Sequence, residues 1–328
     1  MKITIIGGGT GSSAVLNGLK KYPDLDLNVI VSMADDGGSN AVIRDEFGLL
    51  PMSDLRKSII SLSELPNNDK LRELFTYRFA EGDGLRGHTL GNLMMIAANS
   101  INGSEKEALE YICEIFRVKH NVIPVTYSDS RLFAKFSDGS QIKGEHLIDE
   151  PEIADGVKLV EFWMEPKSEA NPDAVKAIQE ADFIIVGPGD LYTTTLANII
   201  VDGIVDAICK SKGKKILITN IMSKVGQTKG MKQSEIVATF GKYCKCKFDY
   251  LLVNSESIPD RVISYYKEHG EHLLEDDLDD SVGKIIRADL IADEIFERDK
   301  GDDLVRSMVR HDSDRLGWEL YKLMKEGR

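Results

Sequence analysis

Short apolar runs alternate with helical stripes along most of the chain. Four of the runs are rich in β-branched residues, which favour buried strands. They lie at residues 2–6, 27–33, 181–186 and 215–221. Helical spacing is seen between them, for example in Leu55, Ile59 and Leu62. Strands that alternate with helices predict an α/β fold with a Rossmann-like, doubly wound, mostly parallel sheet.

The periodicity changes between residues 119 and 165. Short strand-like runs follow one another there, and Asp138-Gly139 is a typical hairpin turn. The runs lie at residues 122–126, 131–136, 141–144 and 157–164. We therefore expect a small β-rich insertion at 119–165 within a single domain that spans residues 1–328.

A glycine cluster, GGGTG, follows the first predicted strand at residues 7–11. A helix is expected directly after it. The free backbone N–H groups and the positive dipole end of that helix form an anion site. The alternative is a tight turn without a ligand. No G-x-x-x-x-G-K-S/T motif is present, which argues against a P-loop kinase or GTPase. The expected phosphate-binding residues are Gly8, Gly9, Thr10, Gly11 and Ser12.

Two carboxylates, Asp35 and Asp36, follow the second predicted strand. Ligands of doubly wound sheets bind outside the carboxyl ends of the strands, so Asp35 is a candidate for contact with a nucleotide ribose. The pair is also a candidate Mg²⁺ site, because Mg²⁺ prefers oxygen ligands. The alternative is an Asp- and Gly-rich turn with solvated carboxylates.

Arginine, histidine and asparagine side chains supply further candidates. Arg44 and Arg56 are candidate phosphate clamps, since a guanidinium matches phosphate in a bidentate way. His88 lies in a glycine-rich loop before an apolar helix and is a candidate acid or base, and Asn92 a candidate for orienting a substrate. Helix capping by His88 is the alternative. Asp35, Asp36 and His88 are the catalytic candidates, although no catalytic role is assigned.

A second glycine turn, GPGDLYTT at residues 187–194, follows the third apolar run and precedes a helix expected at 196–211. Two such strand–turn–helix units predict two phosphate or sugar contacts at one edge of the sheet. The Arg310-His311-Asp312 cluster precedes the last predicted helix. It is a candidate for reaching the same edge, or a helix cap with an ion pair.

Composition narrows the class of protein. The chain has 328 residues and a net charge of −13, which argues against general nucleic-acid binding. No apolar run is long enough for a membrane span, and Met1 leads directly into a strand, so we expect no signal peptide. The four cysteines lack zinc-site spacing, and we interpret them as reduced thiols of a cytoplasmic protein.

Six stretches together resemble the gluconeogenesis factor (YvcK) family of bacteria. That family belongs to one superfamily with the deazaflavin-cofactor enzyme 2-phospho-L-lactate transferase (CofD). The stretches are GGGTG at 7–11, ADDGGS at 34–39, GLLPMSDLRK at 48–57, RFAEGDGLRGHTLGN at 78–92, GPGDLYTTTLANIIVDGI at 187–204 and RHD at 310–312. They occur in the family's order and span nearly the whole chain.

The resemblance implies a cytoplasmic protein that binds a UDP-sugar and is linked to carbon metabolism, cell-wall precursor control and cell shape. Matching by motif implies phosphate contact by Gly8, Gly9, Thr10 and Gly11, and nucleotide or metal contact by Asp35 and Asp36. It implies ligand-edge roles for His88, Asn92, Gly187, Gly189, Tyr192 and Asn220, and UDP-sugar contact by Arg310. The chain departs from the family pattern at Asp190, where Ser is usual, and at 220–230, where a Gln-Pro-Gly-Glu-Thr loop is usual.

Three hypotheses follow. The first is a regulatory protein that binds a UDP-sugar or a dinucleotide such as NAD(P). The second is a Mg²⁺-dependent transferase of the 2-phospho-L-lactate transferase type, acting on a nucleotide diphosphate donor and a deazaflavin. The third, an NAD(P)-dependent oxidoreductase, rests on fold analogy. The partners considered are a small anionic nucleotide ligand, a regulatory protein and a second copy in a homodimer, with no nucleic acid and no membrane span.

Overall fold

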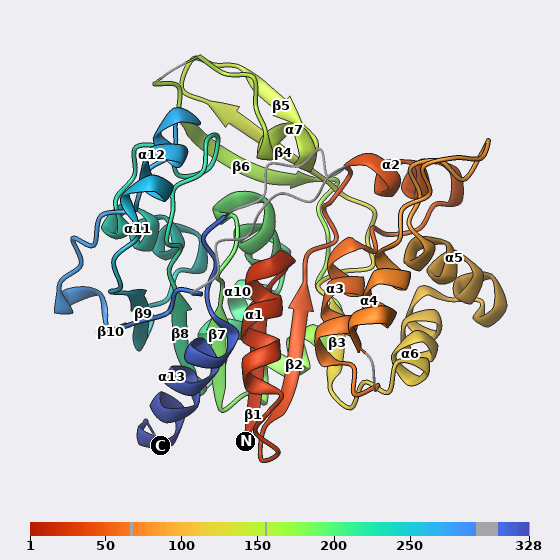
Figure 1. Ribbon diagram of the computed structural model, residues 1–328, viewed down its shortest axis with the longest axis horizontal. Coiled ribbons are helices and arrows are strands. Elements are labelled where there is room, and N and C mark those ends of the chain that lie inside the picture. The colour runs from red at the N-terminus through yellow and green to blue at the C-terminus, as the bar shows by residue number, and fades with distance from the viewer. Residues whose placement is uncertain (66–67, 155, 293–307, 328) are drawn as a thin grey trace.

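A seven-stranded sheet forms the centre of the computed structural model, which describes residues 1–65, 68–154, 156–292 and 308–327 (Figure 1). Its strand order is β10-β9-β8-β7-β1-β2-β3, and every neighbouring pair is parallel. The strands are β1 (Lys2–Gly7), β2 (Asp26–Val31), β3 (Asn121–Pro124), β7 (Phe183–Val186), β8 (Lys214–Ile218), β9 (Tyr250–Asn254) and β10 (Lys284–Ala288). The predicted Rossmann-like α/β fold is confirmed. The strand order reverses between β1 and β7, and doubly wound folds bind ligands at such a point.

Helices cover both faces of this sheet. One face packs against α1 (Gly9–Leu19), α3 (Ser53–Leu62), α5 (Leu90–Asn102), α6 (Glu105–Ile115) and α13 (Ser313–Glu326). The other packs against α8 (Pro172–Gln179), the π-helical turn η1 (Leu191–Leu196), α9 (Ala197–Ile199), α10 (Ile204–Lys210) and α11 (Gln233–Cys244). The remaining elements are α2 (Gly38–Phe47), α4 (Asn68–Thr76), α7 (Glu145–Asp149), α12 (Asp260–Glu268) and η2 (Asp280–Val282).

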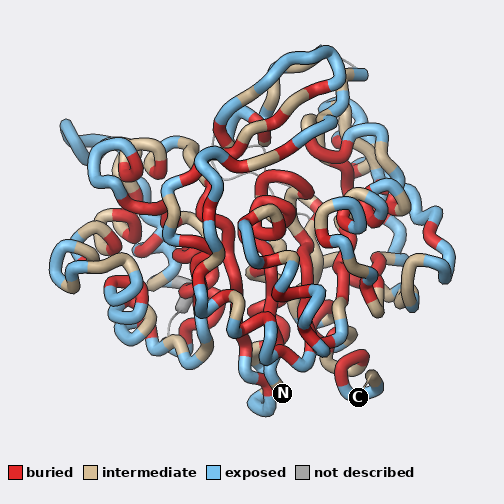
Figure 2. Tube along the Cα trace, turned by 180° about the vertical axis from the view of Figure 1, so that it is seen from behind, coloured by how far each residue is buried: buried red, intermediate tan, exposed pale blue. Residues whose placement is uncertain are grey.

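Successive residues of β1 enter different cores, as the period of a strand requires. Ile3 and Ile5 pack in the core under α1, while Ile6 packs in the core on the opposite face. All three are fully buried, and the strands form the buried centre of the molecule (Figure 2). Such strands are continuous apolar runs, which explains why the sequence pattern found them.

The β-rich insertion is a three-stranded antiparallel sheet in the order β5-β4-β6. It consists of β4 (Arg131–Phe136), β5 (Gln141–Lys143) and β6 (Leu159–Glu165), with α7 between β5 and β6. The start expected at residue 119 is too early, because β3 pairs with β2 in the main sheet. In Figure 1 the insertion lies beyond the carboxyl ends of the main strands, opposite both chain termini.

The helix expected at 196–211 is divided. It becomes α9 and α10, directly preceded by η1, and Gly203 at φ +100 separates α9 from α10. A left-handed backbone conformation interrupts helical hydrogen bonding, and glycine adopts it without strain. Within the described ranges, no helix combines the length and apolarity needed to cross a bilayer.

Candidate functional site

A cleft of about 1020 Å³ opens at the carboxyl ends of β1, β2, β7 and β8. Its walls come from the loops after these strands, from α7 of the insertion and from the segment before α13. This is the position at which the strand order reverses. The fold therefore places the cleft where doubly wound proteins bind their ligands.

The first turn of α1 faces this cleft. Gly8 and Gly9 line it, and Gly9 has φ +63, a conformation that favours glycine. Among the described residues no side chain caps α1, and its first turn contains no acidic residue. The N–H groups and the positive dipole end of α1 therefore face the cleft without a capping hydrogen bond from a described side chain, and the Asp54 carboxylate lies beside Gly8.

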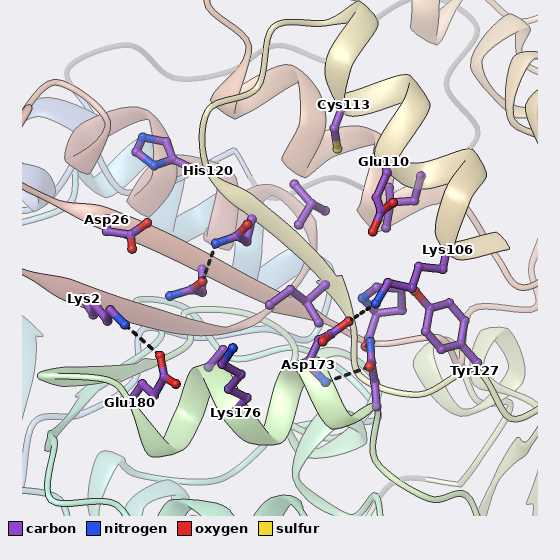
Figure 3. A pocket seen from close by; sticks show the side chains of 18 residues that line it. Lys2, Asp26, Lys106, Glu110, Cys113, His120, Tyr127, Asp173, Lys176 and Glu180 are labelled. Carbon is purple, nitrogen blue, oxygen red and sulfur yellow. Dashed lines mark hydrogen bonds and ion pairs between the residues drawn. The ribbon is translucent and has the colours of Figure 1, made fainter. Parts of the chain in front are cut away.

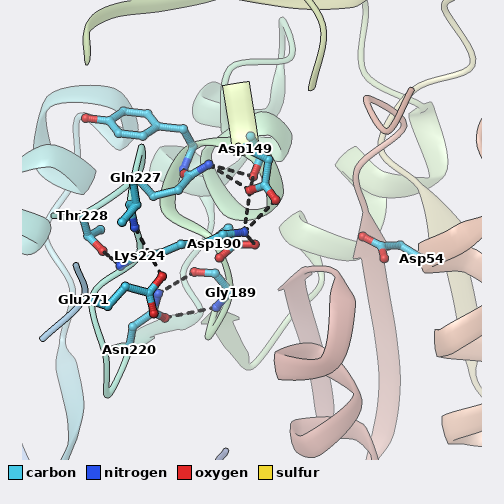
Figure 4. Close-up of polar contacts among 12 residues, drawn as sticks. Asp54, Asp149, Gly189, Asp190, Asn220, Lys224, Gln227, Thr228 and Glu271 are labelled. Atoms are coloured by element: carbon cyan, nitrogen blue, oxygen red, sulfur yellow. Dashed lines mark hydrogen bonds and ion pairs between the residues drawn. The ribbon is translucent and has the colours of Figure 1, made fainter. Parts of the chain in front are cut away.

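The two predicted glycine turns pack directly against each other. A Cβ at Gly11 would collide with the backbone oxygen of Pro188, so only glycine allows this approach. A Cβ added at either Gly8 or Gly189 would lie 3.1 Å from Thr194 Cγ2. Asn220 fixes the second turn, because its side chain donates to Gly189 O at 2.9 Å and accepts from Gly189 N at 3.2 Å (Figure 4). The two turns thus form one wall.

Asp35 is the start of a hydrogen-bond network along the opposite wall. Its Oδ1 accepts from Gly37 N at 3.0 Å, and its Oδ2 accepts from Asn40 Nδ2 at 2.7 Å. Asn40 Nδ2 also donates to Ser53 Oγ at 2.6 Å. Burial is the main cause of a raised pKa at Asp35, and the carboxylate of Asp54 raises it further. Asp35 therefore orders the loop after β2 as well as lining the cleft.

The network continues to Arg56, Asn92 and His88. Arg56 donates to Asn92 Oδ1 at 2.8 Å and also to the Thr89 hydroxyl, which caps α5. Asn92 Nδ2 donates to Ser39 Oγ at 3.0 Å, and Ser39 Oγ is 3.0 Å from His88 Nδ1. Three segments distant in sequence, α2, α3 and α5, are joined here by side-chain hydrogen bonds.

Asp36 points to a different partner. Its Oδ1 accepts from His146 N at 3.0 Å, in the first turn of α7. Asp35 and Asp36 thus bond to different elements, and the described part of the chain contains no group of three His, Cys, Asp or Glu residues suited to a metal ion. The Mg²⁺ site at this pair stays a prediction.

Arg44, the other candidate phosphate clamp, is buried. Its Nη2 donates to Asp129 Oδ1 at 2.5 Å and to the backbone oxygen of Ser130 at 2.6 Å.

A half-buried lysine, Lys224, lines the cleft beside the second glycine turn (Figure 4). Its Nζ donates to both oxygens of Asp149, at 2.7 and 2.6 Å, and to Asp190 Oδ2 at 3.0 Å. Burial opposes the charge of Lys224, but the two carboxylates outweigh it and raise the pKa of this ammonium group. Burial raises the pKa of Asp190, and Lys224 opposes that rise.

Two further titratable groups line the cleft. Burial, assisted by Asp35, Asp149 and Asp36, raises the pKa of Glu145 well above its ordinary value. Burial lowers the pKa of His311 to about 4, and its Nε2 has no hydrogen-bond partner among the described residues. Glu145 is therefore favoured in its protonated form and His311 in its neutral form.

The structure brings most predicted site residues to this cleft. Those that line it are Gly8, Gly9, Thr10, Gly11, Asp35, Arg56, His88, Asn92, Gly189, Asn220 and Arg310. Ser12, Asp36, Gly187 and Tyr192 are outside the lining. Tyr192 packs its ring against Phe162, with centroids 5.6 Å apart, and burial raises its pKa to about 12. The ligand contacts of all these residues stay predictions.

Several lining residues were not predicted. They include Asn40, Asp54, Lys57, Arg72, Arg78, Arg86, Glu145, Asp149 and Lys224. Asn40 had a local signal, since it directly follows the Asp35–Ser39 turn. Glu145 and Asp149 had none, because the sequence pattern does not indicate that α7 folds back over the main sheet.

A second cavity, of about 420 Å³, lies beside β3 between α6 and α8 (Figure 3). Four of its charged side chains form two ion pairs. Lys2 bonds Glu180 at 2.7 Å, and Lys106 bonds Asp173 at 2.7 Å. It lacks a glycine turn, so the cleft at the carboxyl ends is the candidate site.

Comparisons with known proteins agree with this architecture. The family described as 2-phospho-L-lactate transferase CofD matches residues 3–293. A putative gluconeogenesis factor of Thermotoga maritima is 36% identical over 316 residues, which cover 96% of this chain and 97% of the relative. The gluconeogenesis factor of Bacillus subtilis is 35% identical over 326 residues, which cover 99% and 98%.

The fold has a solved counterpart. A crystal structure of a UPF0052 family member from Bacillus halodurans has a TM-score of 0.86 and 29% identity, over 97% of this chain and 98% of that one. The resemblance drawn from the six sequence motifs is confirmed by near full-length matches. The chain therefore belongs to the CofD family and, within it, to the gluconeogenesis factors.

Proposed function

We propose that this protein binds a nucleotide-sugar, specifically a UDP-sugar, in the cleft, and that it acts as a regulator of carbon metabolism, cell-wall precursor supply and cell shape. The observation that supports this most is the first turn of α1. It opens into the cleft without a capping side chain among the described residues, as a phosphate site requires.

Cationic side chains at the mouth of the cleft support an anionic ligand. Arg72 lies in α4, Arg78 and Arg86 lie in the segment between α4 and α5, and all three line the cleft. The acidic residues between Arg72 and Arg86, which are Glu73, Glu81 and Asp83, are outside the lining. In a chain of net charge −13, this arrangement favours a negatively charged ligand locally.

The hydrogen bonds that the catalytic candidates make within the protein favour a regulatory protein over an enzyme. Both oxygens of Asp35 accept hydrogen bonds from the protein, Asp36 caps α7, and His88 Nδ1 is next to Ser39 Oγ. Groups held in this way order the walls of a binding site. The relatives named gluconeogenesis factor add a link to carbon metabolism.

A ligand screen by thermal shift tests the proposal. UDP-N-acetylglucosamine, NADP, GTP and a deazaflavin are compared with and without Mg²⁺. A ligand at a hundred times its Kd stabilises the folded state by about 2.7 kcal/mol. Stabilisation by the UDP-sugar without turnover is the expected result. Deazaflavin binding with phospholactyl transfer would instead establish the transferase, and stabilisation by NADP alone would establish a dinucleotide ligand.

Substitution at Gly9 tests the phosphate assignment. Gly9→Asp introduces a carboxylate at the α1 N-terminus, where the backbone has φ +63 and no atom lies within 4 Å of the new Cβ. Gly9→Asn is the matched control, because Asn and Asp tolerate this conformation similarly. We expect the Asp variant alone to lose most of its affinity. Equal binding by the two variants contradicts the assignment.

A further inference from the structure

The cluster of Asp190, Lys224 and Asp149 extends the proposed function. We propose that Asp190 selects the sugar part of the ligand by accepting a hydrogen bond from one of its hydroxyl groups, and that Lys224 is the positioning residue that holds Asp190. This assignment rests on the proposed function, since it concerns the group attached to the phosphates.

Lys224 has no donor left for a ligand. An ammonium group has three N–H donors. Its three hydrogen bonds go to the two oxygens of Asp149, at 2.7 and 2.6 Å, and to Asp190 Oδ2 at 3.0 Å. The lysine is therefore occupied in holding two carboxylates at a fixed separation. A ligand at this end of the cleft meets those carboxylates before it meets the ammonium group.

The two carboxylates differ in how many further hydrogen bonds they can accept. Asp149 is nearly saturated, because its Oδ1 also accepts from Thr193 Oγ1 at 2.9 Å and from Gln227 Nε2 at 3.1 Å. Asp190 Oδ1 accepts no hydrogen bond from any described residue. The side chain of Asp190 is 35% exposed, against 21% for Asp149. Asp190 is thus the carboxylate that offers an acceptor to the cleft.

Asp190 is next to the predicted phosphate contacts. It follows Gly189, whose turn packs on the α1 N-terminus through Pro188 and Thr194. An acceptor here meets the group that follows the phosphates. Because sugar hydroxyls are donors, a nucleotide-sugar supplies the complement. A second phosphate at this position would be repelled by Asp190.

Lys224 and Lys57 make this arrangement compatible with an anionic ligand. Both lower the pKa of Asp190 against the effect of burial, and Lys57 also pairs with Asp54 at 3.0 Å. Their charges offset the repulsion between Asp190 and the nearby phosphates. The cluster therefore provides a charged acceptor, which makes stronger hydrogen bonds than a neutral one.

Isothermal titration with UDP and with UDP-N-acetylglucosamine separates the sugar from the nucleotide. We expect Asp190→Ala to weaken UDP-N-acetylglucosamine binding about tenfold, the equivalent of one charged hydrogen bond, and to leave UDP binding nearly unchanged. Asp206→Ala, which removes the partner of Lys210 on the exposed face of α10, is the matched control. It should change neither affinity.

The role of Lys224 needs a readout that a general loss of stability would not change. Lys224→Met should lower the ratio of UDP-sugar to UDP affinity as Asp190→Ala does, and Lys224→Arg, which keeps the charge, should restore part of that ratio. An unchanged ratio in Asp190→Ala overturns this assignment alone. If the wild-type protein binds neither UDP nor UDP-N-acetylglucosamine, the proposed function fails, and this assignment fails with it.

Discussion

Arg56 Nη1 donates a hydrogen bond of 2.8 Å to Asn92 Oδ1, and this bond joins α3 to α5 in the wall of the cleft. Asn92 is only 1% exposed, and its Nδ2 reaches Ser39 Oγ at 3.0 Å. One amide group of α5 therefore connects α2 to α3. The shape of this wall depends on Asn92 as much as on any residue exposed in the cleft.

Asn92→Ala should destabilise the fold by about 1–3 kcal/mol, because it leaves the buried Arg56 guanidinium without one acceptor and Ser39 Oγ without a donor. It should also weaken binding of any ligand that stabilises the wild type, since Ser39, which contacts His88, loses the hydrogen bond from Asn92. Urea denaturation and titration calorimetry measure the two effects. Asn102→Ala, at the C-terminal end of the same helix, is the control and should leave ligand affinity unchanged.

Gly18→Ala should lower the free energy of unfolding by about 1–3 kcal/mol through overpacking. A Cβ at Gly18 would lie 2.8 Å from Gly317 Cα, at the contact between α1 and α13, and would collide with Ser313 O. Gly241→Ala is the opposite case, because its Cβ has no neighbour within 4 Å. That control should stabilise α11 by about 0.5–1 kcal/mol, as alanine does in helices. Equal effects of the two substitutions in denaturant would contradict this packing.

Glu145 should make stability fall as pH rises above the ordinary glutamate range. Its pKa is raised in the folded state, so between the unfolded and folded pKa values the folded state binds more protons. Its contribution is therefore present below about pH 4.3 and is lost as pH rises through the folded pKa. Glu145→Gln should remove this loss. Melting temperatures of both proteins from pH 4 to 8 test it, and parallel curves would refute it.

His311 should make the folded state less stable as pH falls. Burial lowers its pKa to about 4, so between pH 6.5 and 4 the unfolded state binds the proton and the folded state does not. Its contribution to stability is present above pH 6.5 and is lost as pH falls. His311→Gln should reduce that loss. Chemical denaturation at pH 7.5 and 5 measures the difference, which should be smaller in the variant.

Local patterns predicted the parts of the site that are local in structure. The first strand, its glycine turn and α1 are consecutive, so dipole and backbone arguments applied directly to GGGTG. The second glycine turn was predictable for the same reason. Both turns end parallel strands, and the alternation of strands and helices was enough to place them at one edge of the sheet.

Contacts between distant segments were not predictable from a single sequence. Asp35 and Asp36 are adjacent, yet Asp36 bonds His146 in an element formed 110 residues later. Similarly, nothing local indicates that β3 joins the main sheet, since its four residues resemble the insertion strands that follow. The departures at Asp190 and within 220–230 appeared separate in the sequence, but Asp190 and Lys224 bond directly at 3.0 Å.

Glu145, His146 and Asp149 of α7 line the cleft, and each end of this short helix is bonded to a different wall of it. Asp36 bonds its first turn from the β2 side, and Lys224 bonds Asp149, its last residue, from the β8 side. A helix that is bonded at both ends shifts as one unit when either attachment shifts. A change in either supporting loop therefore alters the height of the cleft, so Asp36, which is outside the lining, also influences the size of ligand that fits.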